Sequence, residues 1–211
     1  MKTTLLIARH GNTFAPGAVI TRVGAKTDLP LVQSGIEQGL RLGSYMKSYN
    51  LVPDIVYTSN LMRTKQTASY ALESMGVFRP VHENSLFNEV DYGIDENKPE
   101  EAVIARIGKA ALKAWDEEAK VPYGWNINVR EIINGWLKFG ETVRAEHEGK
   151  TVLVVTSNGI ARFAPYLTGN FEGSKKQHNI KLSTGALCHL VNGSASKEWA
   201  ILGWNIKPLS D

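Results

Sequence analysis

Residues 5–13 read LLIARHGNT, a short apolar run that ends abruptly in an arginine, a histidine and a glycine. Apolar runs of this length are typical of buried strands, and α/β proteins bind their ligands where such strands end. An imidazole beside a guanidinium is suited to attack a phosphoryl group that the arginine already holds. The opening of the chain therefore predicts a buried strand that carries Arg9 and His10 into a phosphate site.

Five further segments have the composition of strands. The run TVLVVT at 151–156 is β-branched and apolar without alternation, which is typical of a strand covered on both faces. The other expected strands lie at 54–58, 186–191 and 199–204, with a short one near Val81.

Helical patterns alternate with these strands. Ser34 with Glu37, and Asn128 with Glu131, have the spacing of capping boxes that open helices. Five helices are expected, over residues 34–49, from 59 or 60 to 75, 99–114, 128–143 and 159–167. This alternation predicts an α/β fold, a three-layer sandwich whose mainly parallel central sheet is covered by helices on both faces.

The length of 211 residues predicts a single domain over 1–211, with 86–125 rising over the sheet as a cap or lid. Hydrophobic residues make up 43% and charged residues 21%, which is ordinary for a globular enzyme or binding protein. The net charge is +3 and the longest purely basic run is Lys175-Lys176, so a nucleic-acid partner is not expected.

Cysteine usage and the first residues narrow the class further. Cys188 is the only cysteine, which excludes an internal disulfide framework and a cysteine-rich metal site. The apolar stretch at the start ends at Arg9 and is too short for a signal peptide or a membrane span. We therefore expect a cytoplasmic protein without metal, cofactor or membrane contact; its oligomeric state is left open.

Four chain segments are expected to meet beyond the carboxyl ends of the strands. The first ends in Arg9 and His10, the second continues into Arg63, the third carries Glu89, and the fourth ends at 157–158. Two guanidiniums beside His10 disfavour a second positive charge, so they lower its pKa and favour the neutral nucleophile.

Each group then has an expected role. Glu89 would protonate the leaving oxygen, with Asp91 as the alternative acid. Backbone amides at a glycine and a helix N-terminus bind phosphate. The residues expected to contact phosphate or substrate, besides the arginines, are Gly11, Asn12, Thr13, Arg22, Ser157 and Asn158.

These segments, in this order and spacing, resemble the histidine phosphatase superfamily, also called the phosphoglycerate mutase-like family. The resemblance covers nearly the whole chain and rests on 9–13 (RHGNT), 28–38 (DLPLVQSGIEQ), 59–68 (SNLMRTKQTA), 87–93 (FNEVDYG) and 154–162 (VVTSNGIAR). It implies a metal-independent phosphatase that forms a phosphohistidine on His10, clamps phosphate with Arg9 and Arg63, uses Glu89 as acid and takes a small phosphorylated substrate.

One departure concerns the fourth segment. Members of this family usually carry a second histidine where this chain has Ser157, followed by two glycines where it has Asn158 and Gly159. A serine hydroxyl is shorter and uncharged, and loss of one charge-stabilising donor typically costs about 3–4 kcal/mol of transition-state stabilisation. His178, in the polar stretch 174–179, is a candidate to replace the missing ring.

Two alternatives to a phosphatase stay open. A phosphoglycerate mutase-like phosphotransferase would use Lys98 for its substrate, but no paired arginines lie between Arg106 and Trp125, and residues 15–17 (APG) replace an expected asparagine. A catalytically weak phosphate-binding sensor is the other alternative, and Ser157 is the residue that favours it.

Overall fold

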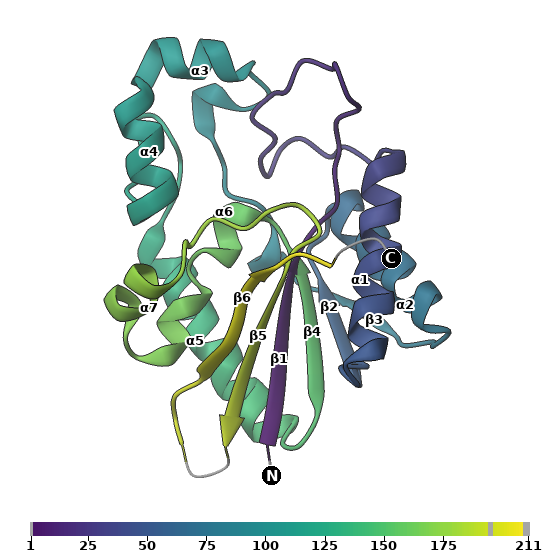
Figure 1. Cartoon of the computed structure of the whole chain (residues 1–211). Helices are drawn as coiled ribbons and strands as arrows, with labels where there is room; N and C mark the ends of the chain where they lie inside the picture. The colour runs from purple at the N-terminus through teal and green to yellow at the C-terminus, as the bar shows by residue number, and fades with distance from the viewer. Residues whose placement is uncertain (1, 194–195, 209–211) are drawn as a thin grey trace.

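The computed structural model describes residues 2–193 and 196–208, and it shows a six-stranded sheet with helices on both faces (Figure 1). The strand order is β3-β2-β4-β1-β5-β6. The strands are β1 (Lys2–Arg9), β2 (Ile55–Thr58), β3 (Val81–Glu83), β4 (Thr151–Thr156), β5 (Leu187–Gly193) and β6 (Ala200–Ile206). All six expected strands are confirmed, with ends shifted by up to three residues.

The sheet is mainly parallel, as expected. Strand β1 pairs parallel to β4, and β2 pairs parallel to both β3 and β4. Strand β5 pairs antiparallel with β1 and with β6, so it alone runs against the other strands of the described chain. The carboxyl ends of β1, β2 and β4 therefore lie at one edge of the sheet.

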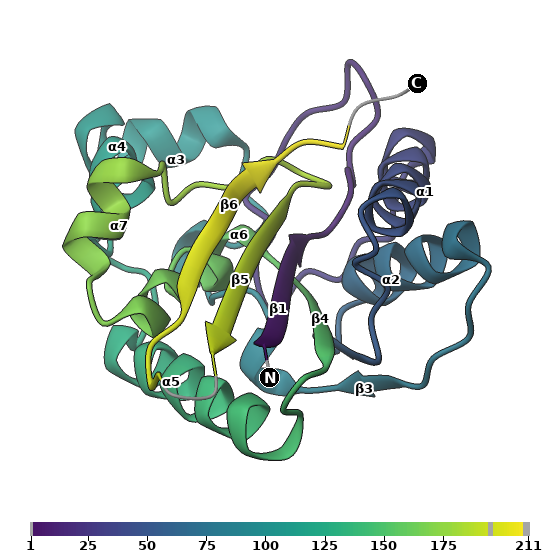
Figure 2. The ribbon, with the colours of Figure 1, turned by 60° about the horizontal axis from the view of Figure 1, so that its bottom comes forward.

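The helices form the two outer layers of the sandwich. Figure 2 shows α1 and α2 on one side of the sheet and α5 and α6 on the other. The helices are α1 (Gln33–Ser48), α2 (Met62–Met75), α3 (Glu100–Ile107), α4 (Lys109–Glu118), α5 (Val129–Glu146), α6 (Asn158–Ala161) and α7 (Phe171–Gln177). Short 3₁₀ turns lie at η1 (Ser85–Phe87), η2 (Gly93–Asp95) and η3 (Ala164–Thr168).

The central strand contributes to a core on each face. Leu5 and Ile7 belong to the cluster beneath α5 and α6, whereas Leu6 and Ala8 belong to the cluster beneath α1 and α2. All four side chains are fully buried. Because successive residues of a strand point to opposite faces, a strand covered on both faces must be apolar throughout, as this one is.

Two of the helix-start predictions differ in outcome. Asn128 caps α5 as expected, because its side-chain oxygen accepts a hydrogen bond from the amide of Glu131 at 3.3 Å. The capping box at Ser34 is wrong: α1 begins at Gln33 after Val32, with no side-chain cap. The hydroxyl of Ser34 instead accepts a hydrogen bond from Asn12 Nδ2 at 3.2 Å.

One expected helix is divided in two, and one helix of the structure was not expected. The expected helix over 99–114 is two helices, α3 and α4, because Gly108 interrupts them at φ 83°, a conformation that favours glycine. The polar stretch 174–179, for which no helix was expected, lies largely in the helix α7.

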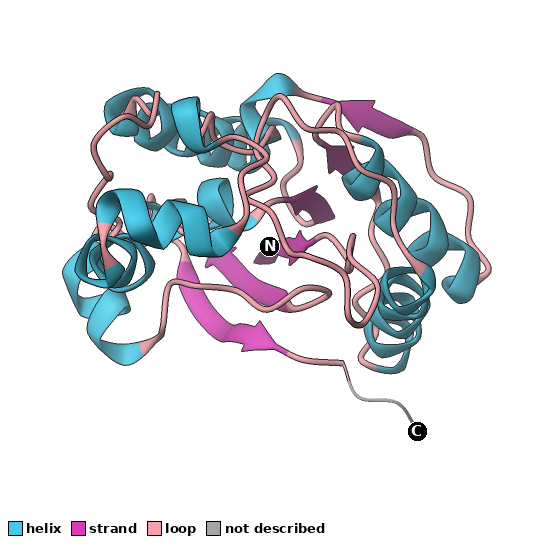
Figure 3. Cartoon of the chain, turned by 90° about the horizontal axis from the view of Figure 1, so that it is seen from above, coloured by secondary structure: helices cyan, strands magenta, loops and turns pink. Residues whose placement is uncertain are grey.

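Helices α3 and α4 and the loop at 10–32 lie beyond the carboxyl ends of the central strands (Figures 1 and 3). Asp95 fastens this region, because it pairs with Arg106 and accepts a hydrogen bond from Trp125 Nε1 at 2.7 Å. An isolated bridge joins Thr21 to Pro99. Within the described ranges, no helix has the length and apolar character needed to cross a membrane.

Candidate active site

His10 lies directly after β1 at the edge where the parallel strands end. Its amide donates to Thr156 O at 3.0 Å, which holds the residue beside the end of β4, and its side chain is only 7% exposed. Ring atom Nδ1 lies 2.7 Å from Gly11 O. Because a carbonyl oxygen only accepts hydrogen bonds, Nδ1 carries the proton and Nε2 keeps its lone pair.

The protonation state of His10 follows from its surroundings. Burial, together with the positive charges of Arg63 and Arg9, holds the pKa of His10 well below its usual value. The hydrogen bond to Gly11 opposes this shift but does not reverse it. The ring is therefore neutral at neutral pH, which is the form that can act as a nucleophile.

Two buried guanidiniums supply the positive charge. Arg9 Nη1 donates to Leu182 O at 2.6 Å, and Arg63, in the first turn of α2, donates to Thr27 O at 2.8 Å and to Gly24 O at 3.2 Å. Neither arginine pairs with a carboxylate in the described part of the chain, and the Nε atom of each is buried without a partner. Such unmatched donors beside a nucleophile suit an oxyanion.

Glu89 contributes a carboxylate to the cavity that His10 lines. Its side chain is 7% exposed, Oε1 accepts from the amide of Val90 at 2.9 Å, and Oε2 accepts from the amide of Gly159 at 3.3 Å. These two bonds fix the carboxylate in the wall of the cavity that His10 also lines.

A cavity of about 640 Å³ brings the predicted residues together. Arg9, His10, Asn12, Thr13, Arg22, Glu89 and Asn158 line it, which is seven of the ten residues expected at the site. Gly11, Arg63 and Ser157 do not line it, although Arg63 is close enough to shift the pKa of His10.

The backbone amides of Gly11 and Asn12 already have partners within the chain. The Gly11 amide donates to Thr67 Oγ1 at 3.0 Å, and the Asn12 amide donates to Gln38 Oε1 at 2.7 Å. A Cβ atom at Gly11 would lie 2.4 Å from Gly35 O, so the glycine permits close packing against α1. Both amides thus donate to side chains in this structure, and their binding to phosphate stays a prediction.

The fourth segment divides between two environments. Asn158 lines the cavity, and its side-chain oxygen accepts from the amide of Leu182 at 2.8 Å. Ser157 is fully buried, and its hydroxyl finds no hydrogen-bond partner among the described residues. A buried hydroxyl without a hydrogen-bond partner destabilises the folded chain, so the serine at this position needs an explanation.

Three alternative residues lie away from the cavity. His178 ends α7, Lys98 is exposed, and Asp91 pairs with Lys26 at 2.8 Å. None of the three lines the cavity that contains His10. In this arrangement Asp91 forms an ion pair with Lys26, and His178 stays outside the residues that line the cavity.

Sequence reasoning predicted Arg22 on the outer side of this cavity, but it missed Glu100, Lys181 and Asp116 beside it. Arg22 Nη2 lies 2.5 and 2.6 Å from the two carboxylate oxygens of Glu100, and Lys181 Nζ lies 2.6 Å from Asp116 Oδ2. All four side chains line the cavity, as do Tyr92 and Thr184. Glu100 and Asp116 lie on helices, where charged residues ordinarily face solvent, and no local pattern distinguishes them or Lys181 from their neighbours.

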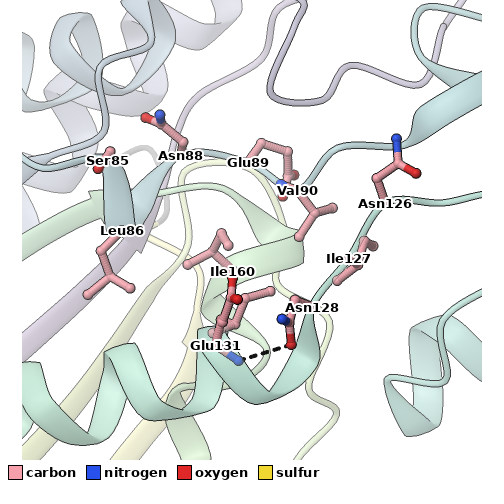
Figure 4. Close-up of a pocket in the computed structure, with 11 residues that line it drawn as sticks. Ser85, Leu86, Asn88, Glu89, Val90, Asn126, Ile127, Asn128, Glu131 and Ile160 are labelled. Carbon is pink, nitrogen blue, oxygen red and sulfur yellow. Dashed lines mark hydrogen bonds between the residues drawn. The ribbon is translucent and has the colours of Figure 1, made fainter.

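A second cavity, of about 310 Å³, lies on another side of Glu89 (Figure 4). Val90 and Ile160 form part of its wall, together with Leu86 and the start of α5. It contains neither His10 nor an arginine among its lining residues. In the part of the chain that is described, no three His, Cys, Asp or Glu side chains gather as a metal-binding cluster.

Comparisons with known proteins agree on one family. A model of the histidine phosphatase superfamily (branch 1) matches residues 5–207. A 2,3-bisphosphoglycerate-dependent phosphoglycerate mutase of Rhizobium etli is 30% identical over 164 residues, which is 76% of this chain and 77% of that protein. The mutase of Clavibacter michiganensis is 30% identical over 121 residues, 56% of this chain and 47% of the mutase, so this match spans about half of that relative.

Solved structures share the fold at low identity. A mycobacterial glucosyl-3-phosphoglycerate phosphatase has a TM-score of 0.75 at 17% identity, covering 98% of this chain and all of that one. The α-ribazole phosphatase of Shigella flexneri has a TM-score of 0.73 at 19% identity, covering 99% of this chain and 98% of that one.

Proposed function

The chain belongs to the histidine phosphatase superfamily, and from this premise we propose that it hydrolyses a small phosphomonoester through a phosphohistidine intermediate on His10. The observation that carries the proposal is the bond from His10 Nδ1 to Gly11 O, which leaves Nε2 free beside two guanidiniums without carboxylate partners. A neutral imidazole nucleophile and a cationic phosphate clamp are the two requirements of this chemistry.

The reaction then needs two displacements at phosphorus. The phosphoryl oxygens bind against Arg9 and Arg63, and His10 Nε2 attacks phosphorus while the bond to the substrate oxygen breaks. Glu89 gives its proton to that leaving oxygen. In the second step Glu89 takes a proton from water, whose oxygen attacks the phosphohistidine, and inorganic phosphate leaves with His10 neutral again.

The distribution of charge favours hydrolysis over the mutase alternative. A mutase acting on a phosphorylated carboxylic acid needs a cation for the carboxylate as well as for the phosphate. Here Lys98 does not line the cavity, and both outer cations, Arg22 and Lys181, are already paired with carboxylates. The sensor alternative rests on Ser157, whose hydroxyl does not line the cavity.

We also propose that the whole chain acts as one domain and that residues 86–125 cap the site. Support comes from Glu89, Tyr92, Glu100 and Asp116, which all belong to this segment and line the same cavity as His10. The segment thereby contributes both the acid and part of the wall that a substrate's organic group would meet.

Hydrolysis of 4-nitrophenyl phosphate tests the proposal. We expect steady turnover by the native chain, no detectable turnover by His10→Ala, and native turnover by the control His178→Ala. A rapidly quenched reaction should contain an acid-labile, base-stable phosphoryl group on His10. If turnover is absent and inorganic phosphate still raises the melting temperature, the sensor function replaces this one.

A further inference from the structure

The outer wall of the cavity carries two ion pairs, each joining segments far apart in the sequence. Arg22, in the loop after β1, pairs with Glu100 of α3, and Lys181, before β5, pairs with Asp116 of α4. Arg22 is further held over the rings of Tyr92 and Trp125, at 5.3 and 5.4 Å from their centroids. These pairs are thus a built part of the wall.

This pairing determines how a second charged group on a substrate would be received. Among the residues that line the cavity, Arg9 is the only lysine or arginine without a carboxylate partner. A substrate carboxylate would have to displace Glu100 or Asp116, and a substrate ammonium would have to displace Arg22 or Lys181. Exchanging one ion pair for another gains little binding free energy, so the wall favours neither a substrate carboxylate nor a substrate ammonium.

A hydroxyl group can bind without breaking either pair. A carboxylate offers about four lone-pair positions, and Lys181 occupies only one oxygen of Asp116. The other oxygen, Oδ1, accepts no hydrogen bond from the described residues and lies 3.8 Å from Arg162 Nη2. That nitrogen forms an ion pair with Oδ1 but makes no hydrogen bond, and its guanidinium is fully buried outside the cavity lining. Oδ1 of Asp116 therefore keeps lone-pair positions that a hydroxyl in the cavity can donate to.

We propose that this wall selects phosphomonoesters of neutral polyols, that is, sugar phosphates, and that Asp116 is the specificity-determining residue. Lys181 holds Oδ2 and so orients the carboxylate, while Oδ1 accepts a hydrogen bond from a substrate hydroxyl. The inference rests on the proposed phosphatase function and adds its substrate class.

Four phosphomonoesters separate the alternatives: glucose 6-phosphate, 3-phosphoglycerate, phosphoethanolamine and 4-nitrophenyl phosphate. The native chain should show a kcat/KM for glucose 6-phosphate about tenfold above those for the carboxylate and the amine, which is the effect of one hydrogen bond of ordinary strength. Measured against 4-nitrophenyl phosphate in the same variant, Asp116→Asn should lower kcat/KM for glucose 6-phosphate about tenfold. The same ratio for 3-phosphoglycerate should rise, because Lys181 becomes free.

The reciprocal variant strengthens the test. Lys181→Met should lower kcat/KM for glucose 6-phosphate by a few-fold, because Asp116 loses the cation that orients it, and should raise kcat/KM for phosphoethanolamine, because the carboxylate becomes available to its ammonium group. Glu117→Gln, on the next residue of α4 and outside the cavity lining, is the matched control and should behave as the native chain. A native preference for 3-phosphoglycerate, or an Asp116→Asn effect equal for all four substrates, would overturn the inference.

Binding separates this inference from the function on which it rests. Melting-temperature shifts of the His10→Ala variant, measured with glucose 6-phosphate, 3-phosphoglycerate and phosphoethanolamine, report the wall without chemistry. The largest shift with glucose 6-phosphate, and its loss in the His10→Ala, Asp116→Asn double variant, would support the wall's selectivity even if the native chain hydrolysed nothing. Equal shifts with all three ligands would contradict it, whatever the rate of catalysis.

Discussion

The carboxylate of Glu89 lies against the first turn of α6: Oε2 accepts a hydrogen bond from the amide of Gly159, and a Cβ atom at position 159 would lie 2.3 Å from Oε1. The same Cβ would meet Val90 Cγ2 at 2.8 Å. Because the amide of Val90 also holds Oε1, the carboxylate cannot yield to a larger residue without losing a hydrogen bond. The absence of a side chain at Gly159 therefore positions the proposed acid.

Gly159→Ala should lower kcat by about ten- to a hundredfold for an alkyl phosphate, part of the contribution of general acid catalysis. For 4-nitrophenyl phosphate the loss should be smaller, because its leaving group needs little protonation. Steady-state rates on both substrates check this. Gly193→Ala is the control, since a Cβ there meets nothing within 4 Å. Equal losses on both substrates would indicate general damage to the site and not a displaced acid.

The depressed pKa of His10 predicts the pH dependence of the rate. Burial is the first cause of the shift and the charge of Arg63 the second. In the native chain kcat/KM should stay level as pH falls to 6.5 and decline only well below it, where Nε2 becomes protonated. Arg63→Gln should move this acid limb to higher pH while lowering the plateau. A limb at the ordinary histidine pKa in the native chain would contradict the assignment of His10.

The same residue should make the fold less stable in acid. Below about pH 6.5 the unfolded chain binds a proton at His10 that the folded chain does not, so the free energy of unfolding falls as pH decreases. This contribution has a slope of at most about 1.4 kcal/mol per pH unit. This loss of stability is absent above about pH 6.5. It stops growing once the pH falls below the pKa of His10 in the folded chain. Urea titrations of the native chain and His10→Ala between pH 7.5 and 4.5 should therefore diverge with this sign.

Ser157→Ala should separate stability from activity. The Ser157 hydroxyl is fully buried without a partner, so its removal should raise the free energy of unfolding by about 1 kcal/mol. If the hydroxyl donates to the phosphoryl group during the reaction, kcat should fall about tenfold in the same variant. Chemical denaturation and 4-nitrophenyl phosphate hydrolysis measure the two effects. A more stable variant with native kcat would remove Ser157 from the proposed site.

Asp95 should govern the stability of the region around α3 and α4. Burial alone would raise its pKa, but hydrogen bonds from Arg106 and Trp125 outweigh burial and lower the pKa of Asp95. Its stabilising effect is therefore present above the unfolded pKa of about 4 and is lost as pH falls through the lower folded pKa. Asp95→Asn should cost about 2 kcal/mol at pH 7, and the difference from the native chain should shrink in strong acid. Glu118→Gln, which breaks only an exposed pair with Lys120, should change little.

The sequence predicted the residues around His10 better than those of the outer wall of the cavity. Arg9 and His10 come where an apolar strand ends. Because ligands of such sheets bind at the carboxyl ends of the strands, the position of these residues in the chain also predicts their place in the fold. Arg63 and Glu89 were placed by the same logic. Lys181 and Asp116 were missed because 65 residues separate them and each resembles an ordinary exposed residue until the fold brings them together.

Local conformation accounts for the other errors. Gly108 stands within a continuous apolar periodicity, so only its positive φ reveals that the helix ends there. Ser34 has the spacing of a capping residue, but Asn12 takes its hydroxyl instead. In both cases a tertiary or backbone constraint overrides a pattern that is correct on its own terms.

Arg63 also holds a loop that forms part of the cavity wall. Its guanidinium donates hydrogen bonds to the carbonyl oxygens of Gly24 and Thr27, in the same loop that carries Arg22. An oxyanion arriving at this cation must share it with those two carbonyls. The side chain that we propose as part of the phosphate clamp is thus also the one that holds the loop of the cavity wall.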